Sequence, residues 1–403
     1  MAIWKECTLS DLGTVVGGAT PSTKDESNYE NGNIPWITPK DLSTFTGRYI
    51  FSGERNITLK GLNSCSAQML PKDTVLFSSR APIGYVAIAG CPVCTNQGFK
   101  SIVPNDKTDS LFLYYLLKYN KEKIENMGSG TTFKEVSGGT MRNIKVIVPE
   151  DKDVQIKIGK ILGSIDDKIE ANTQINNNLY ELLQLSFEND YLEKCQLNSD
   201  WETVTLDFAT SRFGTGLNPR KNFVLGHGSN YYVTIKNMGN NRVYLDERCD
   251  KVDDEAIRKI QNRSDLQVGD LLFSGIGTIG RVYLIDKPVS NWNTSESVFN
   301  LRPNYQIVSS EFLFLLLLNR DMQEYAVTLA SGSVQKGIRM ADLKRYKFIL
   351  PSKDTMDSLT QLWKPIISKI KSNEDENDRL SALRDTLLPK LMSGEIDVTD
   401  LDI

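Results

Sequence analysis

The stretch LFSGIGTIGRV at residues 272–282 has a near copy, LFSSRAPIGYV, at residues 76–86. Alone, the first stretch places Gly275, Gly277 and Gly280 in the G-x-G-x-x-G spacing of a dinucleotide-binding turn. The copy keeps only the last of these glycines, and a β-branched run follows in place of a helix. The pair therefore predicts a glycine-rich strand–turn–strand hairpin. A nucleotide-binding enzyme that uses these three glycines is the distant alternative.

Further segments repeat in the same order along the chain, and this repetition defines its organisation. The offset between copies drifts only from 196 to 202 residues. The other matches include WKECTLSDLG (4–13) with WETVTLDFAT (201–210), PWITPKDL (35–42) with YVTIKNM (232–238), TNQGFKSIVP (95–104) with TSESVFNLRP (294–303), GSGTTFK (128–134) with ASGSVQK (330–336), and IKVIVP (144–149) with YKFILP (346–351). Many weak matches in one order indicate a tandem duplication.

Each copy consists of short strands broken by proline, glycine and asparagine, with one apolar helix expected around 110–125 and 310–327. The segments after each copy carry apolar residues at alternating steps of four and three, which predicts long paired helices. The fold class is α+β: two tandem α+β modules, separated and joined by two long antiparallel coiled-coil helices with pseudo-two-fold symmetry. We place module 1 at 1–150, the central helix at 151–198, module 2 at 199–351, and the second helix with its tail at 352–403.

Asparagines interrupt the apolar seam of both expected helices. Asn172 and Asn176 occupy seam positions in the first helix, and Asn373 and Asn377 occupy the equivalent positions in the second. Such residues lower stability and specify register. Since central positions of an antiparallel pair face one another, we expect Asn172 to pair with Asn377 and Asn176 with Asn373. The alternative is that TQINNN at 173–178 is frayed or exposed.

Charge is distributed unevenly over the 403 residues, whose formal net charge is −4. Residues 1–150 and 201–351 carry net charges of +2 and +3, whereas residues 151–200 and 352–403 carry −5 and −4. The mildly basic modules permit nucleic-acid binding, and the acidic helices suit contact with protein.

The sequence also indicates where the protein works. It contains no run of about 18 apolar residues that predicts a membrane span. The start, MAIWKECTLSDLG, has neither the basic nor the apolar region of a signal peptide. The six cysteines are scattered, as is typical of reduced thiols. We expect a cytoplasmic protein.

Residues for catalysis are scarce. His227, the single histidine, lies in an expected loop and has no counterpart in the first copy. Cys91 and Cys94 have C-x-x-C spacing, but no second pair completes a zinc site. The sequence has no P-loop and no Asn-Pro-Pro-aromatic methyl-transfer signature. We expect a binding protein with no catalytic residues and no metal.

Taken together, the chain resembles the specificity subunit of type I restriction-modification enzymes. The resemblance covers nearly the whole chain. It is carried by the repeated layout, by GF and VF at 98–99 and 298–299, and by the tail LLPKLMSGEIDV at 387–398. The repeated turns containing Ser129, Gly130 and Lys134, and Ser331, Gly332 and Lys336, add to it, as do the endings IVP and ILP.

The resemblance implies a non-catalytic DNA-binding subunit. Each module would be a target recognition domain that reads one half of a bipartite sequence in double-stranded DNA. The two helices would set the gap between the halves and dock two modification subunits, which bring S-adenosylmethionine. Restriction subunits, which bring ATP hydrolysis and Mg²⁺, would complete the complex, so this chain needs no cofactor of its own.

Equivalent positions that differ between the copies are the best candidates for reading bases, because recognition domains diverge there. Arginine suits guanine and glutamine suits adenine, while lysines present in both copies suit phosphate. The candidate DNA-binding residues are Lys40, Ser79, Arg80, Tyr85, Thr131, Thr132, Lys134, Lys236, Ser274, Gly275, Arg281, Ser333, Gln335 and Lys336. The competing interpretation of each is a solvated turn residue or surface lysine. A decoy, or a scaffold for protein or glycan with the same architecture, remains an alternative function.

Overall fold

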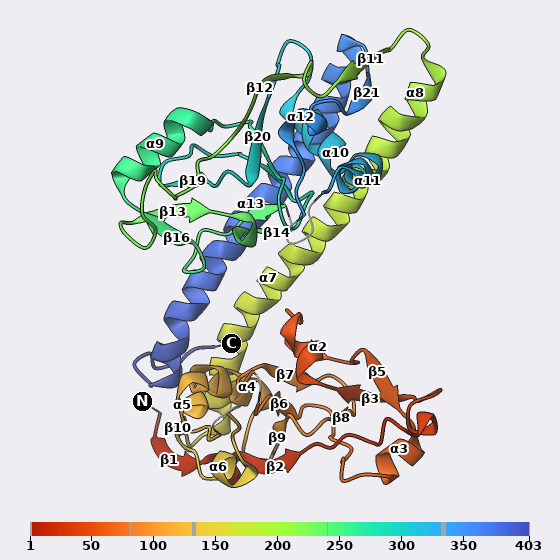
Figure 1. The fold of residues 1–403 in the computed structure, drawn as a ribbon. Helices are drawn as coiled ribbons and strands as arrows, with labels where there is room; N and C mark the ends of the chain where they lie inside the picture. Colours follow the sequence, from red (N-terminus) through yellow and green to blue (C-terminus); the bar gives the residue numbers. More distant parts are fainter. Residues whose placement is uncertain (1, 81, 131–133, 240, 332–335, 403) are drawn as a thin grey trace. The chain divides into compact units, whose positions relative to one another are not determined.

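The computed structural model describes residues 2–80, 82–130, 134–239, 241–331 and 336–402. They form two compact units: unit 1 is Met1–Thr173 with Asp375–Ile403, and unit 2 is Gln174–Glu374. Each unit combines one α+β module with one stretch of each long helix (Figure 1). The α+β class is therefore confirmed.

Within the described ranges, module 1 has a five-stranded sheet in the order β2-β9-β6-β7-β4, a three-stranded sheet β5-β3-β8, and the pair β1-β10. Its strands are β1 Trp4–Thr8, β2 Gly13–Gly17, β3 Ile34–Ile37, β4 Tyr49–Ile50, β5 Arg55–Ile57, β6 Val75–Phe77, β7 Val86–Ala89, β8 Cys94–Thr95, β9 Lys100–Pro104 and β10 Lys145–Pro149. In the smaller sheet, β3 runs antiparallel to β5 and parallel to β8.

Over its described residues module 2 repeats most of this topology, with a four-stranded sheet β12-β20-β17-β18, a three-stranded sheet β16-β13-β19, and the pairs β11-β21 and β14-β15. Its strands are β11 Glu202–Thr205, β12 Thr210–Thr215, β13 Asn230–Val233, β14 Met238–Gly239, β15 Arg242–Val243, β16 Asp250–Val252, β17 Leu271–Ser274, β18 Val282–Leu284, β19 Trp292–Thr294, β20 Val298–Pro303 and β21 Lys347–Leu350. Again β13 runs antiparallel to β16 and parallel to β19. The duplication seen in the sequence thus extends to the sheets, although β4 has no counterpart among the described strands of the four-stranded sheet of module 2.

The apolar helix expected in each module is two helices. Module 1 has α4 Ser110–Tyr119 and α5 Lys121–Asn126, and module 2 has α10 Ser310–Leu318 and α11 Arg320–Thr328. Asn120 and Asn319 interrupt them, and the Asn319 side chain caps α11 by accepting a hydrogen bond from the Asp321 N–H. The shorter helices are α1 Leu9–Leu12, η1 Glu26–Asn28, α2 Pro39–Ser43, α3 Leu59–Asn63, α6 Gly138–Arg142, η3 Ile235–Asn237, α9 Asp254–Ser264 and α12 Met340–Leu343.

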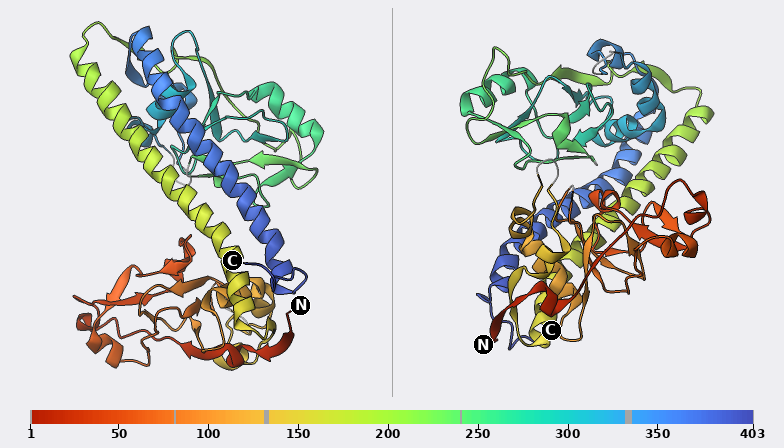
Figure 2. Two further views of the ribbon diagram at one scale, coloured as in Figure 1. Left: turned by 180° about the vertical axis from the view of Figure 1, so that it is seen from behind. Right: turned by 60° about the horizontal axis from the view of Figure 1, so that its bottom comes forward.

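The long helices form as expected. Helix α7 spans Lys152–Ser186 and continues through the π-helical η2 Phe187–Leu192 into α8 Glu193–Leu197, and α13 spans Lys353–Met392. In each unit the two helices run antiparallel, as two views show (Figure 2). Among the described helices, none combines the length and hydropathy needed to cross a bilayer.

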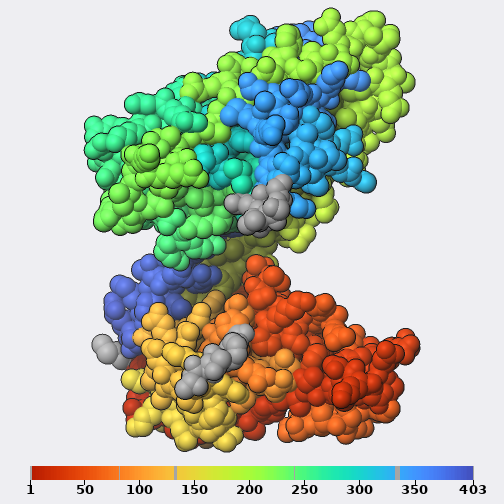
Figure 3. Space-filling model, viewed as in Figure 1, coloured from red at the N-terminus to blue at the C-terminus, as the bar shows by residue number. Residues whose placement is uncertain are grey.

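The cores explain why each unit is compact. In unit 1, Leu391, Met392 and Val398 of the carboxyl-terminal segment are buried in the core of module 1. The Lys157 ammonium donates to the Thr399 carbonyl at 2.7 Å. Figure 3 shows this segment against the yellow and orange surface of the module. In unit 2 the fully buried Trp363 of α13 lies in the core of module 2.

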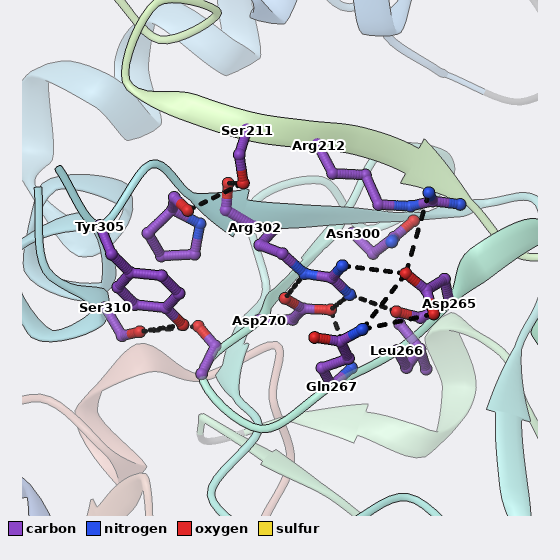
Figure 4. A network of polar contacts seen from close by, with 12 residues as sticks. Ser211, Arg212, Asp265, Leu266, Gln267, Asp270, Asn300, Arg302, Tyr305 and Ser310 are labelled. Atoms are coloured by element: carbon purple, nitrogen blue, oxygen red, sulfur yellow. Dashed lines mark hydrogen bonds and ion pairs between the residues drawn. The ribbon is translucent and has the colours of Figure 1, made fainter. Parts of the chain in front are cut away.

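A network around Arg302 occurs in module 2 alone among the described residues (Figure 4). The Arg302 guanidinium donates to both carboxylate oxygens of the fully buried Asp270, at 2.8 and 2.9 Å, and to Asp265 at 2.9 Å. It joins β20 to the start of β17 and the end of α9. Module 1 has Val103 and Thr74 at the equivalent positions, so the two modules are stabilised differently at this place.

Candidate nucleic-acid interface

The turn between β6 and β7 is held by one serine. Ser78 accepts a hydrogen bond at its hydroxyl from the Tyr85 N–H at 2.8 Å and donates to the Pro82 carbonyl at 2.8 Å. Its carbonyl accepts from the N–H of Gly84, whose φ of +97° favours glycine. The geometry of the turn therefore favours serine at its start and glycine near its end.

The turn between β17 and β18 has the same bonds. The Ser274 hydroxyl accepts from the Arg281 N–H at 2.8 Å and donates to the Thr278 carbonyl at 2.6 Å. Gly280, at φ +92°, donates to the Ser274 carbonyl. Because β17 and β18 are antiparallel neighbours, the glycines belong to a hairpin, and the helix that a dinucleotide turn requires does not follow. The hairpin prediction is confirmed.

In each module this turn is joined to the second predicted DNA-binding segment. In module 1, Ser129 and Glu135 exchange two backbone hydrogen bonds, and the Val136 N–H donates to the Ser79 carbonyl at 2.9 Å. In module 2, Ser331 and Gly337 exchange the same pair, and the Ile338 N–H donates to the Gly275 carbonyl at 2.8 Å. Thus the structure brings together residues 57 positions apart in module 1, Ser79 and Val136, and 63 positions apart in module 2, Gly275 and Ile338. We call each joined pair of segments a paired turn.

The candidates in the paired turns take different positions. Arg80 is half-buried and lies opposite Glu135 in an isolated bridge, while Lys134 and Lys336 are exposed. Tyr85 is half-buried against the core of module 1. Four candidates lie outside the described residues: Thr131, Thr132, Ser333 and Gln335.

Three candidates are used within the fold. The side chains of Ser79 and Ser274 are fully buried and hydrogen bonded to backbone carbonyls, at Gly98 and Thr278. The Gly275 N–H donates to the Ser297 carbonyl, and a side chain there would meet the Phe299 ring. These positions shape the turns, and their side chains do not reach the surface in this structure.

Arg281 is a predicted DNA-binding residue, and in this structure its guanidinium is hydrogen bonded within the module. It donates to the Ile235 carbonyl at 2.7 Å and to the Met238 carbonyl. Arg281 therefore ties the turn to the segment that carries Lys236. Sequence alone could not distinguish this arrangement, because Ile235 and Met238 are more than 40 residues away.

The remaining lysines form equivalent ion pairs in the two modules. Lys40 lies 2.6 Å from Glu54, and Lys236 lies 3.1 Å from Asp250. Both lysines are largely exposed, and the hydrogen bond to Glu54 raises the pKa of Lys40 above its usual value. DNA phosphates would therefore compete with a carboxylate for each ammonium.

A group of basic and aromatic side chains in module 2 was not among the residues predicted from the sequence to bind DNA. The Tyr244 ring has the Arg242 guanidinium 5.5 Å and the Arg248 guanidinium 4.9 Å from its centre. The Lys251 ammonium lies 3.1 Å from the centre of the Tyr231 ring. Aromatic rings with cations are typical of nucleic-acid-binding surfaces. The only signal in the sequence was the alternation of arginine and tyrosine in 242–248.

The asparagine pairs form as the seam predicted. In unit 1 the Asn172 amide donates to the Asn377 side-chain oxygen at 2.9 Å. In unit 2 the Asn373 amide donates to the Asn176 side-chain oxygen at 2.8 Å. Asn172, Asn176 and Asn373 are buried, so the frayed-helix alternative is wrong.

The described histidine and cysteine residues do not form a metal site or a reactive thiol pair. Among the described residues no group of histidine, cysteine and acidic side chains could hold a metal ion. Burial raises the pKa of the Cys94 thiol to about 11, which disfavours the reactive thiolate. His227 is exposed in a loop. The duplicated fold and its paired turns define a protein of two similar α+β modules.

Comparisons with known proteins agree. A family model, type I restriction modification DNA specificity domain, matches residues 1–181 and 198–381. The specificity subunit of type I restriction enzyme MjaIX from Methanocaldococcus jannaschii is 31% identical over 425 residues, 99% of this chain and 94% of that one. The specificity subunit of type I restriction enzyme HindI from Haemophilus influenzae is 26% identical over 71% of this chain and 77% of that one. A crystal structure of the type I restriction-modification S subunit from M. genitalium matches the fold, with TM-score 0.60 and 17% identity over 97% and 96% of the two chains.

The chain belongs to the family of type I restriction-modification DNA specificity subunits. It is a DNA-recognition subunit of a restriction-modification system and not itself an enzyme. Neither the fold nor the comparisons favour the nucleotide-binding, decoy or scaffold alternatives.

Proposed function

We propose that each module reads one half of a bipartite sequence in double-stranded DNA, and that the two long helices set the gap between the halves. The observation that carries this proposal is the paired turn. Both modules build it with the same backbone hydrogen bonds and place different side chains on it, such as Arg80 opposite Ile276 in the alignment. One scaffold with two sets of side chains suits the reading of two different half-sites.

The residues divide by expected role. Arg80, with the loops around Lys134 and Lys336, is our candidate for base reading in the grooves. Lys40 and Lys236 suit phosphates, because both modules keep them exposed at equivalent places. The Tyr244 group suits the backbone or an exposed base edge of the half-site that module 2 reads.

The proposal extends to the complex and its division of labour. The functional segments are 1–150, 151–198, 199–351 and 352–403, with the acidic helices docking two modification subunits. Those subunits would bring S-adenosylmethionine, and restriction subunits would bring ATP hydrolysis and Mg²⁺. The six free cysteines suit the reducing cytoplasm, where such a complex meets DNA.

Methylation mapping tests the proposal. The chain is expressed with its modification subunit in a host that lacks DNA methylation, and modified bases are mapped by single-molecule sequencing. We expect two short specified blocks around a fixed gap, and no modification when this chain is omitted. A single uninterrupted block, or modification that persists without the chain, would contradict the proposal.

A further inference from the structure

Arg48 is a buried cation of module 1 that the DNA-reading proposal does not use. We propose that Arg48 is a positioning residue: it fixes module 1 on α7 and so restricts the gap lengths that the complex accepts. This inference rests on the proposed function.

The guanidinium of Arg48 makes directional contacts with the helix. Its side chain is only 6% exposed. One terminal nitrogen donates to the main-chain carbonyl of Gly163 at 3.0 Å, and the other forms an ion pair with Asp167. Arg48 immediately precedes β4 of the large sheet, so these bonds tie the sheet to one place along α7. A planar guanidinium held at two points resists rotation better than apolar packing does.

Helix α7 is shaped to receive this side chain. A Cβ at Gly163 would lie 2.8 Å from the Arg48 guanidinium and 3.0 Å from Leu111. A Cβ at Gly159, one turn earlier, would lie 3.1 Å from the Phe112 nitrogen at the start of α4. Glycine inside a helix is less favourable than alanine, because it loses more backbone freedom on folding. The two glycines therefore lower helix stability at the place where module 1 approaches most closely.

A second group of contacts braces the same joint. The Tyr115 hydroxyl of α4 donates to Asp166 at 2.6 Å, and the Arg384 guanidinium of α13 donates to the other oxygen of Asp166 at 2.8 Å. Burial raises the pKa of Tyr115 above its usual value, so its proton stays available for donation. Module 1 is thus fixed to α7 at Gly163, Asp166 and Asp167.

Unit 2 has a joint of the same kind with different residues. Arg242 lies 3.9 Å from Glu374 of α13. The buried Lys371 of α13 lies 3.5 Å from Glu374, and its ammonium donates to the Asn241 carbonyl at 3.4 Å. In both units a cation at the start of a short strand, just before β4 or as the first residue of β15, meets an acidic side chain of a long helix. The recurrence favours a role in module placement over a chance contact.

Module placement matters because gap length is discrete. One base pair moves the next half-site by roughly 3.4 Å and turns it by roughly 34°, given about 10.5 base pairs per ~36 Å turn. A module that holds its angle on the helix more tightly than this rejects a gap that is one base pair longer or shorter. A module free to rotate accepts it.

The test uses full-length variants with the modification subunit and DNA carrying both mapped half-sites at gaps from two base pairs shorter to two longer. The variants are Arg48→Gln, Arg48→Lys and Gly163→Ala. The matched control is Arg320→Gln, because Arg320 is 86% exposed. Initial methylation rates are measured at each gap, and melting temperature is measured in parallel.

We expect Arg48→Gln to lower the rate ratio between the native gap and its neighbours by about tenfold, with Arg48→Lys intermediate and Arg320→Gln unchanged. Gly163→Ala should lower the same ratio, which covers the case in which Arg48→Gln does not fold. The base preference within each half-site should stay the same. An equal loss of rate at every gap, or an unchanged ratio in both Arg48→Gln and Gly163→Ala, would overturn the inference. A wild type without bipartite methylation would instead reject the proposed function, and this inference with it.

Discussion

The paired turns of modules 1 and 2 share a backbone and differ in side chains. Ser78 and Ser274 make the same two hydroxyl hydrogen bonds, and Gly84 and Gly280 both adopt positive φ. Outside this scaffold the modules diverge. Module 2 depends on the buried Arg302 network, for which module 1 has apolar or neutral residues. The two copies have kept the backbone geometry of the paired turns, and they differ in the side chains on the turns and in the core beneath them.

Among the single substitutions proposed, we expect replacement of Arg302, which lies in module 2, to lower the unfolding free energy most. Arg302→Leu leaves the fully buried Asp270 carboxylate unpaired, so we expect a loss of about 3–5 kcal/mol in unfolding free energy, measured by urea denaturation. The control Arg345→Leu removes an exposed arginine and should change little. Replacing Asp270 by leucine as well should recover most of the loss. Less than about 1 kcal/mol for the single variant would show that the network is not structural.

Ser79 and Gly275 occupy equivalent positions in the two paired turns, and exchanging the residue types should destabilise module 2 more than module 1. In Gly275→Ser the new Cβ would stand 2.4 Å from the Phe299 ring, and we expect destabilisation by about 1–3 kcal/mol. Ser79→Gly removes one side-chain hydrogen bond to the Gly98 carbonyl, worth about 1 kcal/mol or less. Urea denaturation of the two variants, compared with wild type, measures the loss of unfolding free energy in each. Equal losses would mean that the turns tolerate the same side chains.

The asparagine pairs allow a comparison of the two stretches of helix. Asn373→Leu removes the donor to the Asn176 side-chain oxygen, while the Asn176 amide keeps its bond to the Ile370 carbonyl, and we expect a loss of about 1–3 kcal/mol. Replacing both residues with leucine should restore wild-type stability or exceed it, because an apolar seam is more stable. Urea titration of the single and double variants measures this. If the double variant is less stable than the single variant, the asparagine pair does not lower the stability of the seam, and its expected role in specifying register loses its support.

Acid should weaken module 2 through Asp265. Arg302 lowers the pKa of the Asp265 carboxyl below its ordinary value. The stabilisation is therefore fully present above the unfolded pKa of about 3.9 and is lost as pH falls through the lower folded pKa. The melting-temperature difference between wild type and Asp265→Asn should be constant above pH 5 and shrink below pH ~4. A difference that grows on acidification would reverse the assigned sign.

The smallest effects concern the lysine ion pairs. Glu54→Ala frees Lys40, and Asp250→Ala frees Lys236, so each should strengthen DNA binding slightly. Lys40→Ala should reduce the slope of log affinity against log salt by about 1. Binding titrations at several salt concentrations measure both. Weaker binding by Glu54→Ala would mean that the ion pair, and not the free lysine, contacts DNA.

Features that depend on local pattern were predicted from the sequence. The tandem repeat, the long helices and the pairing of Asn172 with Asn377 follow from spacing, because a seam residue in an antiparallel pair has one possible partner. The strand–turn–strand character of 272–282 followed from comparing the copies. These features need no knowledge of distant contacts.

Features that depend on distant contacts were missed. Arg281 points inward because the carbonyls it binds belong to a segment more than 40 residues away. Arg48 contacts Gly163, which lies 115 residues away in the sequence, and no local sequence pattern predicts this contact. The break at Asn319 was missed because apolar residues continue on both sides of it.

The central claim, one module for each half-site, is tested most directly by methylation maps of two variants. Arg80→Ala alters module 1 and Arg248→Ala alters module 2, each in the complete complex with the modification subunit. We predict that Arg80→Ala relaxes base preference or efficiency in one block only, that Arg248→Ala does so in the other, and that the gap stays fixed. If both variants alter the same block, or each alters both blocks together, the two modules do not read separate half-sites.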